Sequence, residues 1–189
     1  MIFCFGFWGG GEQFLRPFYF MNINFFYQKH RSIALYAPQK AIIIKINRAL
    51  ELIQSVDKKE YKKLFLRLRV IFITRRHGIT NEFFMPEKIW FANRSLIEKN
   101  DVSWIASLII HEAFHATQFK RGKYIVPLDK LEPPALKVQA IFLKKIEGTS
   151  GITAIESVKK NKYWKKMAKD VKSYTYFRNL LKYLENQKL

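Results

Sequence analysis

The chain has 189 residues, of which 49% are hydrophobic and 26% charged, a composition typical of a folded globular protein and not of a disordered one. Its 34 Lys and Arg and 15 Asp and Glu give a net charge of +19, which would attract polyanions, although lysines scattered over a solvated face give the same total. The single cysteine excludes an intrachain disulfide and a cysteine zinc cluster and fits a reducing compartment, so we expect the cytoplasm. No stretch reaches the roughly 18 apolar residues that a transmembrane helix needs.

The N-terminal segment is aromatic, but it has no basic region, and Gly9 to Glu12 interrupt it early, so we predict no conventional signal peptide. Met21 opens a new stretch, and residues 1–20 are therefore either a non-native extension of the reading frame or an aromatic tail that touches a membrane. Because the pattern up to Pro38 is ambiguous, we assign residues 1–38 to an N-terminal tail that need not be ordered.

Regular patterns begin after Pro38. Apolar residues at helical spacing predict a helix from about residue 39, and a second short helix is predicted over 58–66. Residues 68–73 and 88–93 are rich in β-branched and aromatic residues, which is typical of strands.

The second half of the chain is predicted to be helical. Residues 102–120 are apolar on nearly every side, which indicates a helix buried in the middle of the protein. Pro133 and Pro134 predict the start of a helix over 133–147, and Gly148 predicts its end. Residues 151–189 form a basic segment with an amphipathic helical pattern. We therefore expect an α+β fold with a small sheet, in one domain over residues 39–189.

The central helix carries the motif His111-Glu112-Ala113-Phe114-His115. Histidines four residues apart lie on one side of a helix, and their ring nitrogens can reach one zinc ion. Glu112 lies about 100° further round the helix, where it can reach a water on the metal and act as a general base. The motif thus supplies two metal ligands and a base.

The apolar surroundings of this motif favour a metal site over a chance match. Burial of two imidazoles and a carboxylate without partners costs several kcal/mol, and a metal supplies such partners. The alternative is a pair of core histidines bonded to backbone carbonyls, but an acidic residue such as Glu112 is rarely fully buried unpaired.

The stretch IIHEAFHATQ resembles the active-site helix of the HExxH zinc metallopeptidases, the zincins, and the order of elements over residues 68–148 fits them. A third histidine of the metzincin type is absent, so the resemblance is closest to small gluzincin-like proteins. It implies a small sheet packed on the HExxH helix, with residues 88–93 as the edge strand that takes an extended substrate. It also implies a glutamate on the following helix as the third ligand.

Four downstream acids could supply this ligand: Asp129, Glu132, Glu147 and Glu156. We favour Glu132, because LEPPALKVQAIFL resembles the E..A...Q..FL helix that follows HExxH in small zincin-like proteins. An acid at a helix start, favoured by the helix dipole, is the alternative explanation of Glu132, and Asp129 is its nearest rival. Gln139 on that face either orients a ligand or packs.

The resemblance implies a Zn²⁺-dependent metallopeptidase in which His111, His115 and Glu132 hold the metal and Glu112 activates water. Its partner would be a peptide or protein substrate. The alternative is an inactive zincin-like basic protein that binds nucleic acid or an acidic membrane surface. Residues 151–189 carry ten Lys and Arg and three acids, a net charge of +7, but their regular apolar stripe favours packing on the core. The sequence leaves the oligomeric state open.

Overall fold

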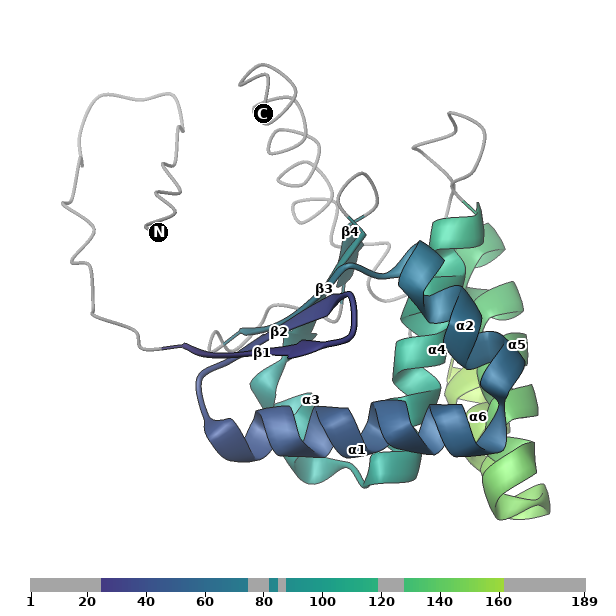
Figure 1. The fold of residues 1–189 in the computed structure, drawn as a ribbon. Coiled ribbons are helices and arrows are strands. Elements are labelled where there is room, and N and C mark those ends of the chain that lie inside the picture. Colours follow the sequence, from purple (N-terminus) through teal and green to yellow (C-terminus); the bar gives the residue numbers. More distant parts are fainter. Residues whose placement is uncertain (1–24, 75–81, 85–87, 119–127, 162–189) are drawn as a thin grey trace, which may run out of the picture.

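A single mixed sheet forms one layer of the protein. The structure is a computed structural model and describes residues 25–74, 82–84, 88–118 and 128–161 (Figure 1). The five strands of these ranges lie in the order β1-β2-β3-β5-β4. They are β1 (Phe26–His30), β2 (Ile33–Ala37), β3 (Val70–Thr74), β4 (Glu82–Phe84) and β5 (Ile89–Asn93). The central strands β2, β3 and β5 run parallel, and β1 and β4 pair antiparallel at the two edges.

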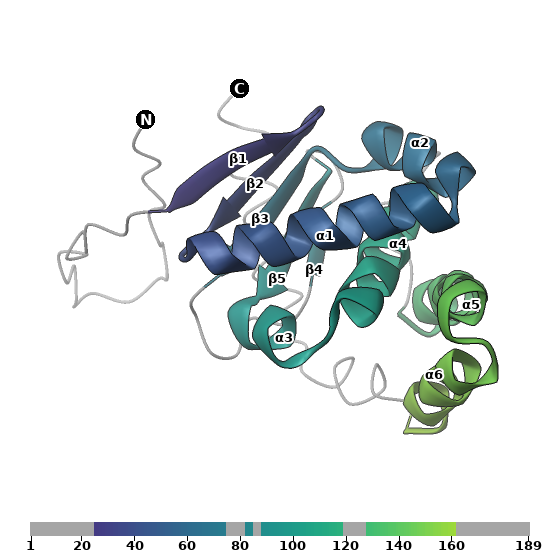
Figure 2. The same cartoon turned by 60° about the horizontal axis from the view of Figure 1, so that its bottom comes forward.

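Helices form the rest of the described chain. They are α1 (Lys40–Val56), α2 (Lys58–Arg67), α3 (Arg94–Lys99), α4 (Val102–Gln118), α5 (Leu128–Glu147) and α6 (Thr149–Asn161). Helix α1 crosses one face of the sheet and packs on α4, and α5 lies beside α4 with α6 beyond it (Figure 2). This arrangement confirms the predicted α+β class, and α4 is buried in the middle of the protein as predicted.

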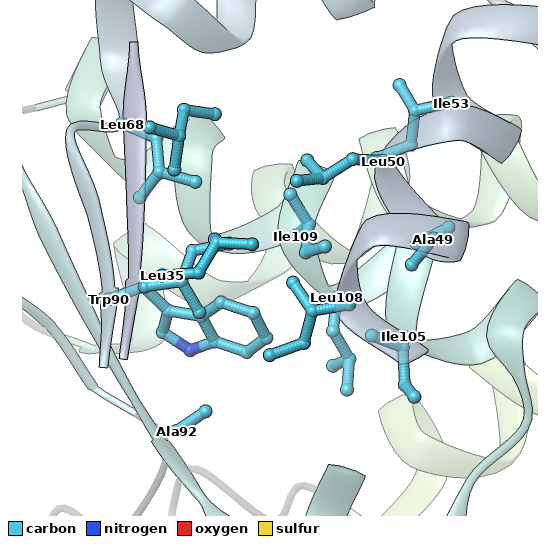
Figure 3. Close-up of a cluster of buried hydrophobic side chains, with 14 of the residues drawn as sticks. Leu35, Ala49, Leu50, Ile53, Leu68, Trp90, Ala92, Ile105, Leu108 and Ile109 are labelled. Carbon is cyan, nitrogen blue, oxygen red and sulfur yellow. The ribbon is translucent and has the colours of Figure 1, made fainter. Parts of the chain in front are cut away.

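The core lies between the sheet and the helices α1 and α4. Inward side chains of the sheet, such as Leu35 and Trp90, meet Leu50 of α1 and Ile105 and Ile109 of α4 (Figure 3). All five are fully buried. The side of α4 that carries Ile105 and Ile109 therefore packs in the core, and polar residues of α4 with another role must lie on a different side of the helix.

Residues 26–37, which the sequence analysis placed in the N-terminal tail, form the hairpin β1–β2 instead. The alternating burial of β2 shows why: Ile33, Leu35 and Ala37 all point into the core. The two-residue turn contains neither glycine nor asparagine, and Arg31 adopts a positive φ of 53°. The Arg31 guanidinium lies over the rings of Tyr61 and Phe65, 5.2 and 5.6 Å from their centroids, which offsets this unfavourable conformation. Residues 1–24 lie outside the described part of the chain.

The prediction that residues 88–93 form the edge strand is wrong. Strand β5 pairs with β3 on one side and with β4 on the other, so it lies inside the sheet. Burial alternates along the strand, with Trp90 and Ala92 fully buried in the core. The edge strand on that side of the described sheet is β4, which runs antiparallel to β5 and contacts α4.

Helix α5 begins at Leu128, five residues before the predicted start, and contains Pro133 and Pro134 in its interior. Proline at these positions removes backbone donors to the first-turn carbonyls, which is why the sequence predicts a later start. Both prolines are exposed, while their neighbours Leu131 and Ala135 are buried, so packing outweighs the loss.

The end of α5 confirms the prediction for Gly148. This glycine has a φ of +65°, and its N–H donates to the carbonyl of Lys144 at 3.0 Å. Helix α6 then packs back on α5 through Ile155, Leu136 and Leu143, and a Cβ at Gly151 would lie only 2.8 Å from that of Leu143. Helix α6 therefore includes the first residues of the predicted basic segment and packs on α5, and residues 162–189 lie outside the described ranges. Within those ranges, no helix is long and apolar enough to cross a membrane.

Candidate metal centre

Helix α4 carries the candidate site inside the protein. The Asp101 carboxylate accepts a hydrogen bond from the N–H of Trp104 at 2.7 Å, and this fixes the start of the helix. Eleven of its seventeen residues are buried. His111, Glu112 and His115 are 6%, 4% and 6% exposed, so the three polar side chains of the motif are withdrawn from water. Such burial of polar groups requires partners close by.

Glu132 of α5 meets both histidines. Its Oε2 lies 3.3 Å from Nε2 of His111, and its Oε1 lies 3.6 Å from Nε2 of His115. The two Nε2 atoms are 3.2 Å apart. These three residues form a group that could hold a metal ion, with all ligand atoms within 4.8 Å of one another.

The spacing of the three donors fits a small tetrahedral cation. Zinc binds imidazole nitrogen and carboxylate oxygen at about 2.0–2.1 Å, and tetrahedral angles then place neighbouring ligand atoms about 3.3 Å apart. The two Nε2 atoms, 3.2 Å apart, and Nε2 of His111 and Oε2 of Glu132, 3.3 Å apart, lie close to that value, while the 3.6 Å contact of His115 is with the other carboxylate oxygen, Oε1. Two imidazoles and one carboxylate are also the donor set of catalytic zinc sites that keep a fourth position open.

The other candidate acids do not contribute in the same way. Glu147 and Glu156 are exposed, away from this buried group. The side chain of Asp129 lies outside the described residues. A peptidase also needs a donor that holds the developing oxyanion. The sequence offers His77 and four tyrosines without singling one out, and all of them lie outside the described residues: His77, Tyr124, Tyr163, Tyr174 and Tyr176.

Gln118 supports the site and was missed from the sequence. Its Nε2 donates to the carbonyl of Leu131 at 2.8 Å, so its Oε1 faces Nδ1 of His115 at 2.6 Å. Since an amide oxygen only accepts hydrogen bonds, Nδ1 of His115 carries the proton, and Nε2 of His115 is left with a lone pair that can accept from Nε2–H of His111 at 3.2 Å or bind a metal. The bond to Leu131 also ties α4 to the residue next to Glu132. The sequence contained one indication of this role: Gln118 follows His115 by three residues on the same helix, so the two side chains are neighbours.

The charges of the cluster are coupled. Burial tends to lower the pKa of His111, but its hydrogen bond with Glu132 and the negative charges of Glu112 and Glu132 outweigh burial and raise it. Burial and the neighbouring charge on His111 lower the pKa of His115 to about 4. Burial raises the pKa of Glu132, but the hydrogen bond and charge of His111 lower it by more. The raised pKa of His111 favours its protonated form beside the Glu132 carboxylate, and the lowered pKa of His115 favours a neutral imidazole.

Glu112 lies on the same buried turn of α4. It directly follows His111 in the helix and is 4% exposed, so it lies in the same buried region as the metal-binding group. It does not belong to the group of three ligands. This is the placement expected of a base beside the site.

No protein family, curated protein or solved structure matches this chain. The functional reading therefore rests on the geometry and chemistry of the site.

Proposed function

We propose that the chain is a zinc-dependent metallopeptidase of the gluzincin-like type. The observation that carries the proposal is the set of Nε2 and carboxylate separations of 3.2, 3.3 and 3.6 Å among His111, His115 and Glu132. One metal ion would account together for the two buried imidazoles of α4 and for the carboxylate that α5 brings beside them. Helix α5 brings Glu132 to the two histidines of α4, which lie 17 and 21 residues before it in the chain.

His111, His115 and Glu132 would hold the metal. Zinc bound there would polarise a carbonyl and lower the pKa of a water toward neutrality. Glu112 would accept the proton of that water and later donate it to the leaving amine.

The substrate would be an extended peptide. Strand β4 lies at the edge of the described sheet next to α4, and a peptide that added alongside β4 would approach the helix of the site. We therefore assign the role of edge strand to β4 and not to β5, for which it was predicted from the sequence.

The experiment is the hydrolysis of a mixed pool of unfolded peptides by the zinc-loaded protein and by a Glu112→Gln variant. The variant keeps the size of the side chain and all three ligands, so we expect it to bind zinc while its rate falls about 10²–10⁴-fold, as for loss of a general base. Equal rates in the two proteins would reject the catalytic role of Glu112.

A second candidate function has one observation in its favour. Lys58, Lys59, Lys62 and Lys63 of α2 line a surface hollow, and a row of cations of this kind attracts polyanions. A basic protein that binds nucleic acid or an acidic membrane would show tight, salt-dependent binding to one of them and no hydrolysis of peptides.

A further inference from the structure

Two buried polar residues, Ser107 of α4 and Gln139 of α5, form a hydrogen bond with each other on the side of α4 that carries His111. Ser107 is fully buried, and its hydroxyl donates to the carbonyl of Trp104 at 2.7 Å. Gln139 of α5 is 2% exposed, and its Nε2 lies 3.0 Å from Oγ of Ser107. Neither side chain has access to bulk water, so each polar atom requires a partner within the protein.

The hydroxyl of Ser107 determines which way the amide of Gln139 points. A hydroxyl has a single proton, and that of Ser107 goes to the Trp104 carbonyl, so toward Gln139 it can only accept. Gln139 must therefore donate through Nε2. Its Oε1 then lies at the other end of the amide and can only accept hydrogen bonds.

His111 holds the complementary donor. Its Nδ1 is buried, and among the described residues no group forms a hydrogen bond with it. A buried N–H left without a partner costs about 1–3 kcal/mol. Ser107 lies four residues before His111, one turn away on the same side of α4, so Gln139, which contacts Ser107, lies on the side of the helix that carries the orphaned nitrogen.

The same arrangement is already complete at the other histidine. There Gln118 donates through Nε2 to a carbonyl and accepts from Nδ1 of His115. The amide nitrogen of each glutamine is thus fixed by a hydrogen bond, Gln118 to the carbonyl of Leu131 and Gln139 to the hydroxyl of Ser107.

We propose that Gln139 is a positioning residue that accepts a hydrogen bond from Nδ1–H of His111 when the metal binds, and so presents Nε2 of His111 to the metal. This inference rests on the proposed function and assigns to that site a pair of supporting amides, Gln118 and Gln139. Metal-bound histidines are oriented in this way by acceptors behind the ring, and loss of such an acceptor lowers metal affinity about 10–100-fold.

The test compares zinc affinity, by competition with a chelating dye, in the full chain and in Gln139→Met and Gln139→Glu variants. Methionine keeps the size of the side chain but removes the acceptor, so we expect affinity to fall about 10–100-fold. Glutamate keeps an acceptor toward His111 and should bind zinc within a few-fold of the unchanged protein. Gln118→Met is the matched variant at His115 and should weaken binding to a similar degree.

A second readout needs no variant. In the zinc-loaded protein with ¹⁵N-labelled histidine, the Nδ1 proton of His111 should give a resonance that exchanges slowly with water. A rapidly exchanging proton, or a Gln139→Met protein that binds zinc as tightly as the unchanged chain, would overturn the inference and leave the metal site intact. Failure of the unchanged chain to bind zinc would instead reject the proposed function and this inference together.

Discussion

Replacement of Ile109 by alanine should destabilise the protein by about 3 kcal/mol. Ile109 is fully buried between the sheet and α1, among Leu50 and Trp90 (Figure 3). The change removes three carbon atoms, worth about 0.8 kcal/mol each, and the cavity adds to this, so the loss falls within the range of about 2–5 kcal/mol for such substitutions. Urea unfolding of the metal-free protein, followed by circular dichroism, measures it.

Two further variants control this measurement. Ile109→Val removes one carbon and should cost about 0.5–1.5 kcal/mol. Ile44→Ala makes the same change as Ile109→Ala on α1, at a residue that is 45% exposed, and should shift stability by less than about 0.5 kcal/mol. A loss in Ile109→Ala no larger than that in Ile44→Ala would refute the packing of α4 described above.

The same variant also tests how the site is held. Ile109 and His111 are two positions apart, about 200° around the helix, so packing and metal binding use opposite sides of α4. Folded Ile109→Ala protein should therefore bind zinc with unchanged affinity, and zinc at 100 times Kd should raise the unfolding free energy of both proteins by about 2.7 kcal/mol. A more than tenfold change in Kd would show that the two sides are coupled.

Three further predictions concern a ligand and two contacts between elements. Glu132→Gln removes the charge of one of three protein ligands, so zinc affinity should fall on the order of 100-fold or more, and calorimetry that gives an unchanged Kd would reject Glu132 as a ligand. Tyr61→Phe removes the 2.8 Å hydrogen bond to Nε2 of His30, which ties the hairpin to α2, and should cost about 1 kcal/mol in urea unfolding; no loss would mean that this bond contributes nothing. The pKa of Asp57 is lowered, because its hydrogen bonds with Lys145 and with the N–H of Glu60 and the charge of Lys145 outweigh its burial, which acts to raise it. The ionised form thus contributes stability above the usual value of 3.8, and this contribution is lost as pH falls through the lowered pKa. Asp57→Asn keeps an acceptor for the N–H of Glu60, so it should be less stable than the unchanged protein at pH 7 and equal to it at the acidic end; a constant difference at all pH values would contradict this.

Much of the fold follows from local pattern. The spacing of apolar residues predicts α1 and α4, and the β-branched runs predict β3 and β5, because each of these elements buries a face whose period is visible in the sequence. The apolar residues around the motif at His111 also predict that the motif is buried, as it is.

The hairpin β1–β2 was not predictable in the same way. Its strand β1 is mostly exposed, and its turn depends on Arg31, whose conformation is supported by the distant rings of Tyr61 and Phe65. Tertiary contacts of this kind leave no signal in the local sequence.

The early start of α5 and the supporting amides have a similar explanation. Residue preferences exclude Glu132 from a helix because Pro133 follows it, and only packing against α4 reverses this. The role of Gln118 depends on a carbonyl 13 residues away, which α5 brings to it, so the sequence could identify the residue but not its partner. The sequence favoured Glu132 through a resemblance, and the structure supplies the distances.

The most direct test of the proposed centre is the zinc content of the full chain after dialysis against zinc and then against metal-free buffer. We predict one zinc per chain in the unchanged protein and none in a His115→Ala variant that is folded by circular dichroism. An unchanged protein that retains no zinc, or a His115→Ala protein that retains one equivalent, would contradict the assignment of this centre.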